Sequence, residues 1–250
     1  MSHYQAAFFP TSHHELSLHA YISLPRQPQL LKILSGITGM APESFFNHHL
    51  VFKPKLPKIS PVAADMFYIQ LVCRVAEDPK AREDTYKPRE QRWTMRLDDF
   101  PEVTRKPVVA RAVYSANTGM GDVIEFAEEL GYTLQTPYFT ENDRFIHNNV
   151  VITLTRTYTP PAPPPAPHPS GGGGEPAEDE LFGSPFPREA LSMVDLSGGW
   201  VLQAAVRVAS NTDVENINVG VAELRALKES LKGVCELEVV ERLALDTRVR

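Results

Sequence analysis

Polar residues alternate with apolar ones in several segments of the chain, a spacing that puts them on one face of a β-strand. In residues 15–22, Glu15, Ser17, His19 and Tyr21 share one face, and aliphatic side chains share the other. The matching faces of four later segments carry Arg92, Thr94 and Arg96; Arg111, Val113 and Ser115; Gln203, Ala205 and Arg207; and Glu236, Glu238, Val240 and Arg242. If these faces point inward together, they line a charged, hydrated lumen whose carboxylates suit divalent cations and whose basic groups suit phosphates.

A second interpretation of the same residues needs no ligand. Glu236, Glu238, Arg92 and Arg96 would then pair with one another and with water inside the lumen, or would simply face solvent. We favour this interpretation, and we expect no catalytic residues, no bound cofactor and no metal.

The histidines do not indicate a zinc site. None of them has the i, i+4 spacing of a helical metal site; they include His13, His14, His19, His48, His49 and His147. Adjacent residues point to opposite sides of a strand, so His48 and His49 cannot easily share a metal. Surface or hydrogen-bonded histidines are the better interpretation.

The familiar phosphate-binding and nucleophile motifs are also absent from the sequence. There is no GxGxxG, no Walker loop and no GxSxG elbow. Gly119 and Gly121 precede a short helix and fit a turn and cap better than a phosphate cradle.

Two apolar pairs are candidates for partner contacts. Phe45 and Phe46 precede a strand, and adjacent aromatics cannot both bury on one of its faces, so at least one is free to contact a partner. The alternative is a loop aromatic that plugs a barrel end, and the same argument covers Phe8 and Phe9 in the N-terminal arm. Leu181 and Phe182 form a possible docking motif in a linker, or the edge of the next ordered segment.

The elements that would position these residues are mostly strands. We expect strands over 15–22, 48–53, 66–75, 91–97, 108–117, 199–208 and 235–239, and a long hairpin over 132–139 and 145–158. Residues 141–143 would form its tip, and Asn148–Asn149 would mark a second break or a bulge. The chain is therefore mainly β with short helices (α+β), and many alternating strands without a βαβ rhythm favour a closed or nearly closed antiparallel β-barrel.

Three helices complete the expected elements. One starts at Pro25 or Pro28 and ends at Gly39. A second begins at an Asp122–Glu125 capping box and carries the stripe Val123, Phe126 and Leu130. A third begins at a Thr212–Glu215 capping box, precedes Gly233, and carries the stripe Val214, Ile217, Val221, Leu224, Leu227 and Leu231. Strand, helix and strand thus recur at both ends of the chain, which suggests a duplicated unit.

The domain organisation follows from composition. We expect one β-barrel domain made of residues 14–158 and 196–250 together, a flexible arm over 1–13, and a disordered Pro/Gly-rich linker over 159–187. A long apolar stripe after the linker indicates that ordered structure continues to the C-terminus.

Charge and composition exclude several classes. The net charge is −6 and the pI is about 5.8, which argues against general nucleic-acid binding. The two cysteines lie far apart and offer neither a disulfide framework nor a zinc site, so a reducing compartment fits best. No apolar run approaches 20 residues, and the first ten residues do not resemble a secretory signal.

Strings at both ends of the chain resemble the Mediator subunit 18 family of fungal type. Near the N-terminus they are residues 31–36, LKILSG, and 49–54, HLVFKP; near the C-terminus they are 201–204, VLQA, 228–233, KESLKG, and 243–248, LALDTR. The resemblance implies a nuclear, non-enzymatic subunit of the Mediator head module that acts as a coactivator of RNA polymerase II transcription. It also implies a heterodimer with Mediator subunit 20, a tether to the C-terminal helix of Mediator subunit 8, and contacts with other head subunits and RNA polymerase II. No sequence-specific nucleic-acid binding and no membrane association are expected, and nuclear entry together with partners is an option, since no basic import block is present.

The barrel expected for that family is similar to the triphosphate tunnel fold, which leaves a second hypothesis open. The tunnel enzymes carry an ExExK pattern on their first strand, where this chain reads Glu15, Ser17 and His19. One ExE remains, at Glu236 and Glu238, so a metal site built from these carboxylates would be underpopulated. The alternative function is a metal-dependent phosphohydrolase or cyclase of the tunnel class.

Overall fold

The computed structural model describes residues 9–55, 66–76, 86–117, 121–161 and 181–249. Its strands are β1 (Phe9–Ile22), β2 (Glu43–Pro54), β3 (Ile69–Val75), β4 (Thr94–Asp98), β5 (Val109–Asn117), β6 (Tyr132–His147), β7 (Val150–Thr159), β8 (Ser192–Met193) and β9 (Trp200–Val208). The α-helices of this part of the chain are α1 (Gln27–Thr38), α2 (Val123–Glu129) and α4 (Val214–Ser230).

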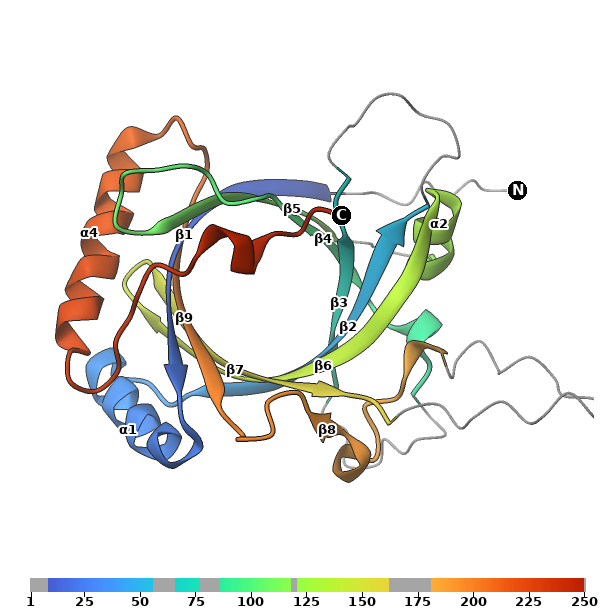
Figure 1. The fold of residues 1–250 in the computed structure, drawn as a ribbon, viewed down its shortest axis with the longest axis horizontal. Helices are drawn as coiled ribbons and strands as arrows, with labels where there is room; N and C mark the ends of the chain where they lie inside the picture. The colour runs from blue at the N-terminus through green and yellow to red at the C-terminus, as the bar shows by residue number, and fades with distance from the viewer. Residues whose placement is uncertain (1–8, 56–65, 77–85, 118–120, 162–180, 250) are drawn as a thin grey trace, which may run out of the picture.

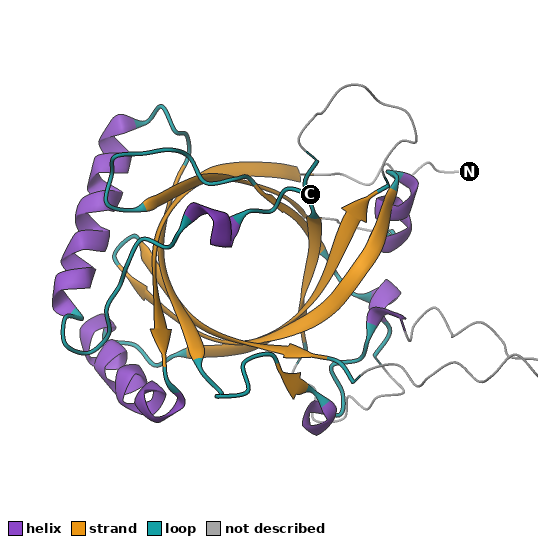
Figure 2. Ribbon diagram, in the orientation of Figure 1, coloured by secondary structure: helices purple, strands orange, loops and turns teal. Residues whose placement is uncertain are grey.

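Eight of the strands close into an antiparallel barrel (Figures 1 and 2). The order is β6-β2-β3-β4-β5-β1-β9-β7, and β7 pairs again with β6, so the ring has no free edge apart from the two-residue β8 beside β7. Strand β9 comes from beyond residue 196 and lies between β1 and β7, so both ends of the chain share one sheet. The expected fold class, mainly β with short helices and a closed antiparallel barrel, is confirmed.

Two of the helices cover one side of the barrel wall. The outward aliphatic face of β1, with Leu16, Leu18, Ala20 and Ile22, packs in a single core with the inner faces of α1 and α4. Gly220 lets α4 approach closely, because a Cβ there would lie 2.9 Å from Val206 Cγ1. Figure 1 shows α1 and α4 on the same side of the ring. Burial of this face explains why the apolar half of the alternating pattern points outward.

A second core covers the wall formed by β2 and β3. The buried faces of Leu50, Phe52, Ile69 and Leu71 pack against Trp93, and α2 adds its own buried residues Val123, Ile124 and Ala127. The expected stripe of α2 was therefore partly wrong, since Leu130 is 53% exposed. The cap was right, because the Asp122 carboxylate accepts from the Ile124 and Glu125 amides.

Several expected boundaries are corrected. The β6–β7 hairpin turns at Asn148–Asn149, where Asn148 adopts a φ of 54°, and the expected tip, residues 141–143, lies inside the paired strands. Asparagine tolerates this left-handed backbone, so it closes the turn. Strand β1 begins at Phe9, inside the expected arm, because its first residues pair with the far end of β5.

The C-terminal half of the barrel also differs from expectation. Helix α4 is capped by Asp213 rather than Thr212, and its carboxylate accepts from the Asn216 amide. The strand expected over 235–239 is wrong: only a single bridge joins Glu238 to His19, and residues 242–245 form a 3₁₀ turn. We call residues 235–249 the C-terminal strap, because they run across one mouth of the barrel (Figure 1).

Residues 162–180 of the expected linker lie outside the described residues, but its end is ordered. Phe182 is 3% exposed and packs in the core under α2, and Phe186 packs near Phe46 and Tyr86. The prediction of disorder is therefore wrong for residues 181–187. Their aromatic side chains gain more from burial than the chain loses in conformational freedom.

Candidate functional site

The polar face of β1 points into the barrel, as expected from the alternation. Glu15 is 3% exposed, and its Oε1 accepts from Arg111 Nε at 3.3 Å, from Arg111 Nη2 at 3.2 Å and from Gln203 Nε2 at 3.2 Å. Its other oxygen lies 3.9 Å from Arg96 Nη2. The register of β1 places Glu15 opposite both Arg111 on β5 and Arg207 on β9. The sheet thus surrounds this carboxylate with arginine.

A second carboxylate, which the sequence analysis did not identify as a lumen residue, completes the ionic network. Asp98 at the end of β4 lies 2.6 Å from Arg96 Nε and 3.1 Å from Arg111 Nη2. Two carboxylates and two guanidinium groups therefore neutralise one another inside the wall. Asp98 continues the Thr94–Arg96 alternation by one step, which was the available signal. A divalent cation would have to displace arginines from both carboxylates, and no group of three possible metal ligands exists among the described residues.

The remaining tunnel-type carboxylates do not reach this network. Glu236 and Glu238 are both exposed on the C-terminal strap, and Glu236 accepts from the Gly233 amide at 3.4 Å. Arg92 is exposed and precedes β4, so it does not share the inward face of Arg96. Without a ligand, these four residues were expected either to pair inside the lumen or to face solvent. Arg96 pairs inside the lumen, and Arg92, Glu236 and Glu238 are exposed.

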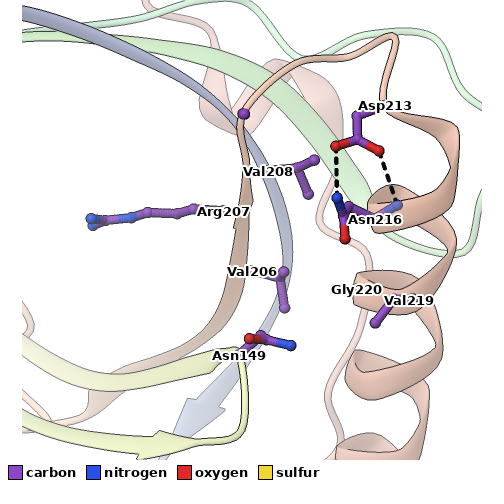
Figure 3. Close-up of a pocket in the computed structure, with 9 residues that line it drawn as sticks. Asn149, Val206, Arg207, Val208, Asp213, Asn216, Val219 and Gly220 are labelled. Carbon is purple, nitrogen blue, oxygen red and sulfur yellow. Dashed lines mark hydrogen bonds between the residues drawn. The ribbon is translucent and has the colours of Figure 1, made fainter.

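Arg207 supplies a further cation to the interior. Figure 3 shows its side chain pointing into the barrel, away from the shallow groove between β9 and α4 that Val206, Val208 and Gly220 line. No ion pair of Arg207 is present within the described part of the chain. The lumen therefore carries more positive than negative charge around β1, β4, β5 and β9.

Three histidines of the wall have pKa values well below the ordinary 6.5. Burial, with a smaller effect of Arg111, lowers the pKa of His19 to about 4. Burial, with smaller effects of His48 and Arg96, lowers the pKa of His49 to about 3. His48 points outward instead, between Tyr86 Oη at 2.7 Å and the Phe182 carbonyl oxygen at 2.9 Å, and burial lowers its pKa to about 3. His48 and His49 thus lie on opposite sides of β2, as expected, and both are hydrogen-bonded.

Two of the four residues expected to bind partners are buried within the chain. Phe46 stacks on Phe139 with ring centroids 6.0 Å apart, and Phe182 fills the core under α2. Neither is free to contact a partner, because each supplies core packing. Phe45 lies between the guanidinium groups of Arg74 and Arg144, at 4.8 and 5.2 Å, and Leu181 is 52% exposed. The role of Phe45 and Leu181 in contacting a partner stays a prediction.

The C-terminal strap is fastened across the barrel mouth by specific contacts. Its Glu238 exchanges two backbone hydrogen bonds with His19 on β1. At the other side, Arg242 donates twice to the Pro101 carbonyl oxygen, and Thr247 Oγ1 donates to the Asp98 carbonyl oxygen at 2.6 Å. Arg242 and Arg248 both stack on Phe100, at 4.4 and 3.9 Å from its ring centroid. The strap ties the end of β1 to the end of β4.

Comparison with known proteins gives this arrangement a family. The family model described as "Med18 protein" matches residues 14–248. The chain belongs to the Mediator subunit 18 family. One curated relative, "Mediator of RNA polymerase II transcription subunit 18" of Neosartorya fischeri, is 31% identical over 95% of this chain and 100% of its own length.

One solved structure shares the fold of this chain. A chain of the Schizosaccharomyces pombe Mediator head module covers 91% of this chain and 98% of its own, with a TM-score of 0.69 and 20% identity. The S. pombe Pct1 RNA triphosphatase also aligns, over 90% of this chain, but its TM-score of 0.37 and 8% identity carry no functional argument. The motif LALDTR, which carried part of the sequence resemblance, is the part of the strap that binds Phe100 and Asp98.

Proposed function

We propose that this chain is a non-enzymatic structural subunit of the Mediator head module and a coactivator of RNA polymerase II transcription. Membership of the Mediator subunit 18 family supports the assignment to Mediator. Within that assignment, the chain forms a heterodimer with Mediator subunit 20 and is tethered through the C-terminal helix of Mediator subunit 8. It works in the nucleus, contacts other head subunits and RNA polymerase II, and binds no nucleic acid in a sequence-specific way.

The observation that carries the non-enzymatic part is the saturated pair of lumen carboxylates. Glu15 and Asp98 each bind arginine side chains, and Glu236 and Glu238 lie outside on the strap. Ser17 and His19 also stand where the tunnel enzymes carry a carboxylate and a lysine, so the donor set for a divalent metal is incomplete. No described helix is long and apolar enough to span a bilayer.

Purification of the tagged protein from nuclear extracts tests the assembly. Mediator head subunits, with subunits 20 and 8 in equal amounts to the bait, are the expected companions by mass spectrometry. A tagged chain that co-purifies with no Mediator subunit, although it is folded and expressed at its normal level, would contradict the proposal.

A metal-dependent phosphohydrolase or cyclase of the tunnel class is the second candidate. The polar lumen with its excess of arginine favours it, because such a lumen attracts phosphates. The engaged carboxylates disfavour it, and phosphate release from nucleoside triphosphates with magnesium or manganese tests it directly.

A further inference from the structure

An arginine inside the barrel lacks an anionic partner. Arg207 is the penultimate residue of β9, and Figure 3 shows its side chain pointing into the ring. It stands opposite Glu15 in the β1–β9 pair, but the Glu15 carboxylate accepts from Arg111 and Gln203 instead. Arg207 has neither a hydrogen bond nor an ion pair with any residue that the structure describes. It is exposed, so solvent reaches this side chain inside the barrel.

A buried imidazole nitrogen beside Arg207 also lacks a partner. His13 shares the inward face of β1 with Glu15, and its Nε2 is buried without a hydrogen bond. Burial lowers the pKa of His13, and the positive charge of Arg207 lowers it further, which places the two side chains close together. A neutral imidazole carries one N–H, which can sit on either nitrogen. His13 can therefore donate to an acceptor inside the lumen, and buried polar atoms normally have such a partner.

Two further arginines lie at the same mouth of the barrel. Arg74 near the end of β3 and Arg144 near the end of β6 both bind the Glu43 carboxylate, with Arg74 Nη1 at 2.7 Å from Oε1. The register of the sheet brings the ends of β3, β6 and β9 to one mouth, opposite the C-terminal strap. We call it the open mouth. Two guanidinium groups share one carboxylate there, which leaves one positive charge in excess.

The interior as a whole is polar and positively charged. The carboxylates of Glu15 and Asp98 balance the two arginines that bind them, so the excess comes from Arg207 and from the two arginines at Glu43. Uncharged inward residues such as Gln70 and Thr153 are half-buried rather than sealed in an apolar core. A positive field between low-dielectric walls concentrates small anions.

The chemistry of these groups selects the class of anion. A guanidinium presents a planar fork of N–H donors that matches two oxygens of one phosphate or carboxylate group. A phosphate-type oxyanion carries more than one negative charge, so a single ion can offset the whole excess at the open mouth. A chloride ion offers neither the charge nor the paired oxygens.

We propose that Arg207 and His13 bind a phosphate-type oxyanion inside the open mouth of the barrel, without a divalent cation, and that Arg74 and Arg144 attract it. No metal is required, because the ligand meets cationic donors directly. The anion stabilises the barrel by neutralising Arg207, and no bond in it is broken. The site lies within this chain, so it needs no other Mediator subunit and its test is separate from that of the proposed function.

Calorimetric titration of the purified full chain tests the site, with EDTA present and with inorganic phosphate and tripolyphosphate as probes. The variant Arg207→Gln removes the unpaired guanidinium at an exposed position. The matched control, Arg225→Gln, removes an exposed arginine from α4. We expect Arg207→Gln to raise the Kd for tripolyphosphate at least about tenfold and the control to change it less than about twofold.

Thermal melts give an independent readout of the same binding. Without anion, both variants should melt within about 2 °C of the wild type, because both positions are exposed. Tripolyphosphate should raise the melting temperature of the wild type and of Arg225→Gln, and should leave that of Arg207→Gln nearly unchanged. Sodium chloride of equal ionic strength should not reproduce the rise.

Several outcomes would overturn the proposal. They are no binding by the wild type at millimolar tripolyphosphate, equal binding by Arg207→Gln, and binding that appears only when magnesium is added. A glutamate peptide of the same charge that binds as tightly as tripolyphosphate would also overturn it, because the interior would then recognise charge alone.

Chemical protection of the wild-type chain locates the anion without any variant. Phenylglyoxal modifies accessible guanidinium groups, and mass spectrometry measures the extent at each arginine. Tripolyphosphate should protect Arg207 and leave Arg225 reactive; equal protection of both would mean diffuse surface binding and overturn the site. Adenosine triphosphate in EDTA then distinguishes the source of the phosphate. A Kd equal to that of tripolyphosphate supports a site for the phosphate chain alone, and a lower Kd supports a nucleotide as the occupant of the same site.

Discussion

Arg111 donates from both Nε and Nη2 to a single oxygen of Glu15, across the β1–β5 pair in the barrel wall. The same guanidinium also reaches Asp98 at 3.1 Å, so one arginine joins the two acidic groups of the lumen. This geometry engages both carboxylates with arginine side chains inside the barrel.

The purified protein should therefore release no phosphate from nucleoside triphosphates or from RNA with a 5′-triphosphate, with magnesium or manganese present. The reason is that Glu15 and Asp98 are engaged by arginine and are too few to hold the cation. A colorimetric phosphate assay measures this. Metal-dependent turnover that disappears in Glu15→Gln or Asp98→Asn variants would establish the enzyme hypothesis instead.

Removal of one partner of the buried network should destabilise the fold. Glu15→Ala leaves Arg111 buried without part of its compensation, and we expect a loss of about 3–5 kcal/mol in the free energy of unfolding. Urea titration measures the loss. The matched control is Glu90→Ala, whose pair with Lys87 is exposed, and its effect should be at most about 1 kcal/mol. A loss at Glu15 as small as the control's would show that the network contributes little.

The part of the linker before Leu181 should be dispensable for folding. The part that contains Phe182, which packs in the core, should be required for stability. Deletion of Pro161–Pro176 should leave the melting temperature nearly unchanged, because Pro, Gly and acidic residues have little to bury. Phe182→Ala should cost about 3–5 kcal/mol, because it empties a core position. Thermal melts compare the two, and a deletion that lowers the melting temperature by more than a few degrees would show that the removed segment packs.

The C-terminal half should be required for the N-terminal half to fold. A chain ending at Pro160 lacks β9, so β1 and β7 lose their shared neighbour and expose edges. We expect it to be insoluble or molten. Leu224 is fully buried on the inner face of α4, and Leu224→Asp should unfold the whole protein cooperatively. A compact, cooperatively melting fragment of residues 1–160, seen by calorimetry, would mean that the chain holds two domains.

Acid should weaken the fold through the buried histidines. The folded-state pKa is about 4 for His19 and about 3 for His48 and His49, below the ordinary 6.5, so the unfolded chain binds more protons. Their stabilisation is complete above pH 6.5 and is lost as the pH falls from there toward 4 for His19 and toward 3 for His48 and His49. At pH 5 each costs roughly 2 kcal/mol.

Urea unfolding at pH 7 and pH 5 measures this pH dependence. A His49→Gln variant should show a smaller difference between the two pH values than the wild type. An equal pH dependence in the two proteins would assign the acid sensitivity to other groups.

Local patterns predicted much of this protein. Alternation placed Glu15 and Leu16 on opposite faces of β1, and Asp122 and Gly39 marked helix ends correctly, because strand faces and caps depend on near neighbours in sequence. The barrel class followed from the number of alternating segments, and the strings at both ends indicated the family.

Only the tertiary structure decided which polar groups meet. Arg111 and Asp98 neutralise Glu15 because the closed ring brings β1, β4 and β5 into register, and no spacing within one segment encodes that contact. Phe182 became a core residue for a similar reason, because it packs with α2 and Trp93. The C-terminal strap is held by Phe100, on which Arg242 and Arg248 stack. These surfaces lie between about 50 and 150 residues away in the sequence. Local pattern sets the faces of the elements, and long-range packing decides what those faces touch.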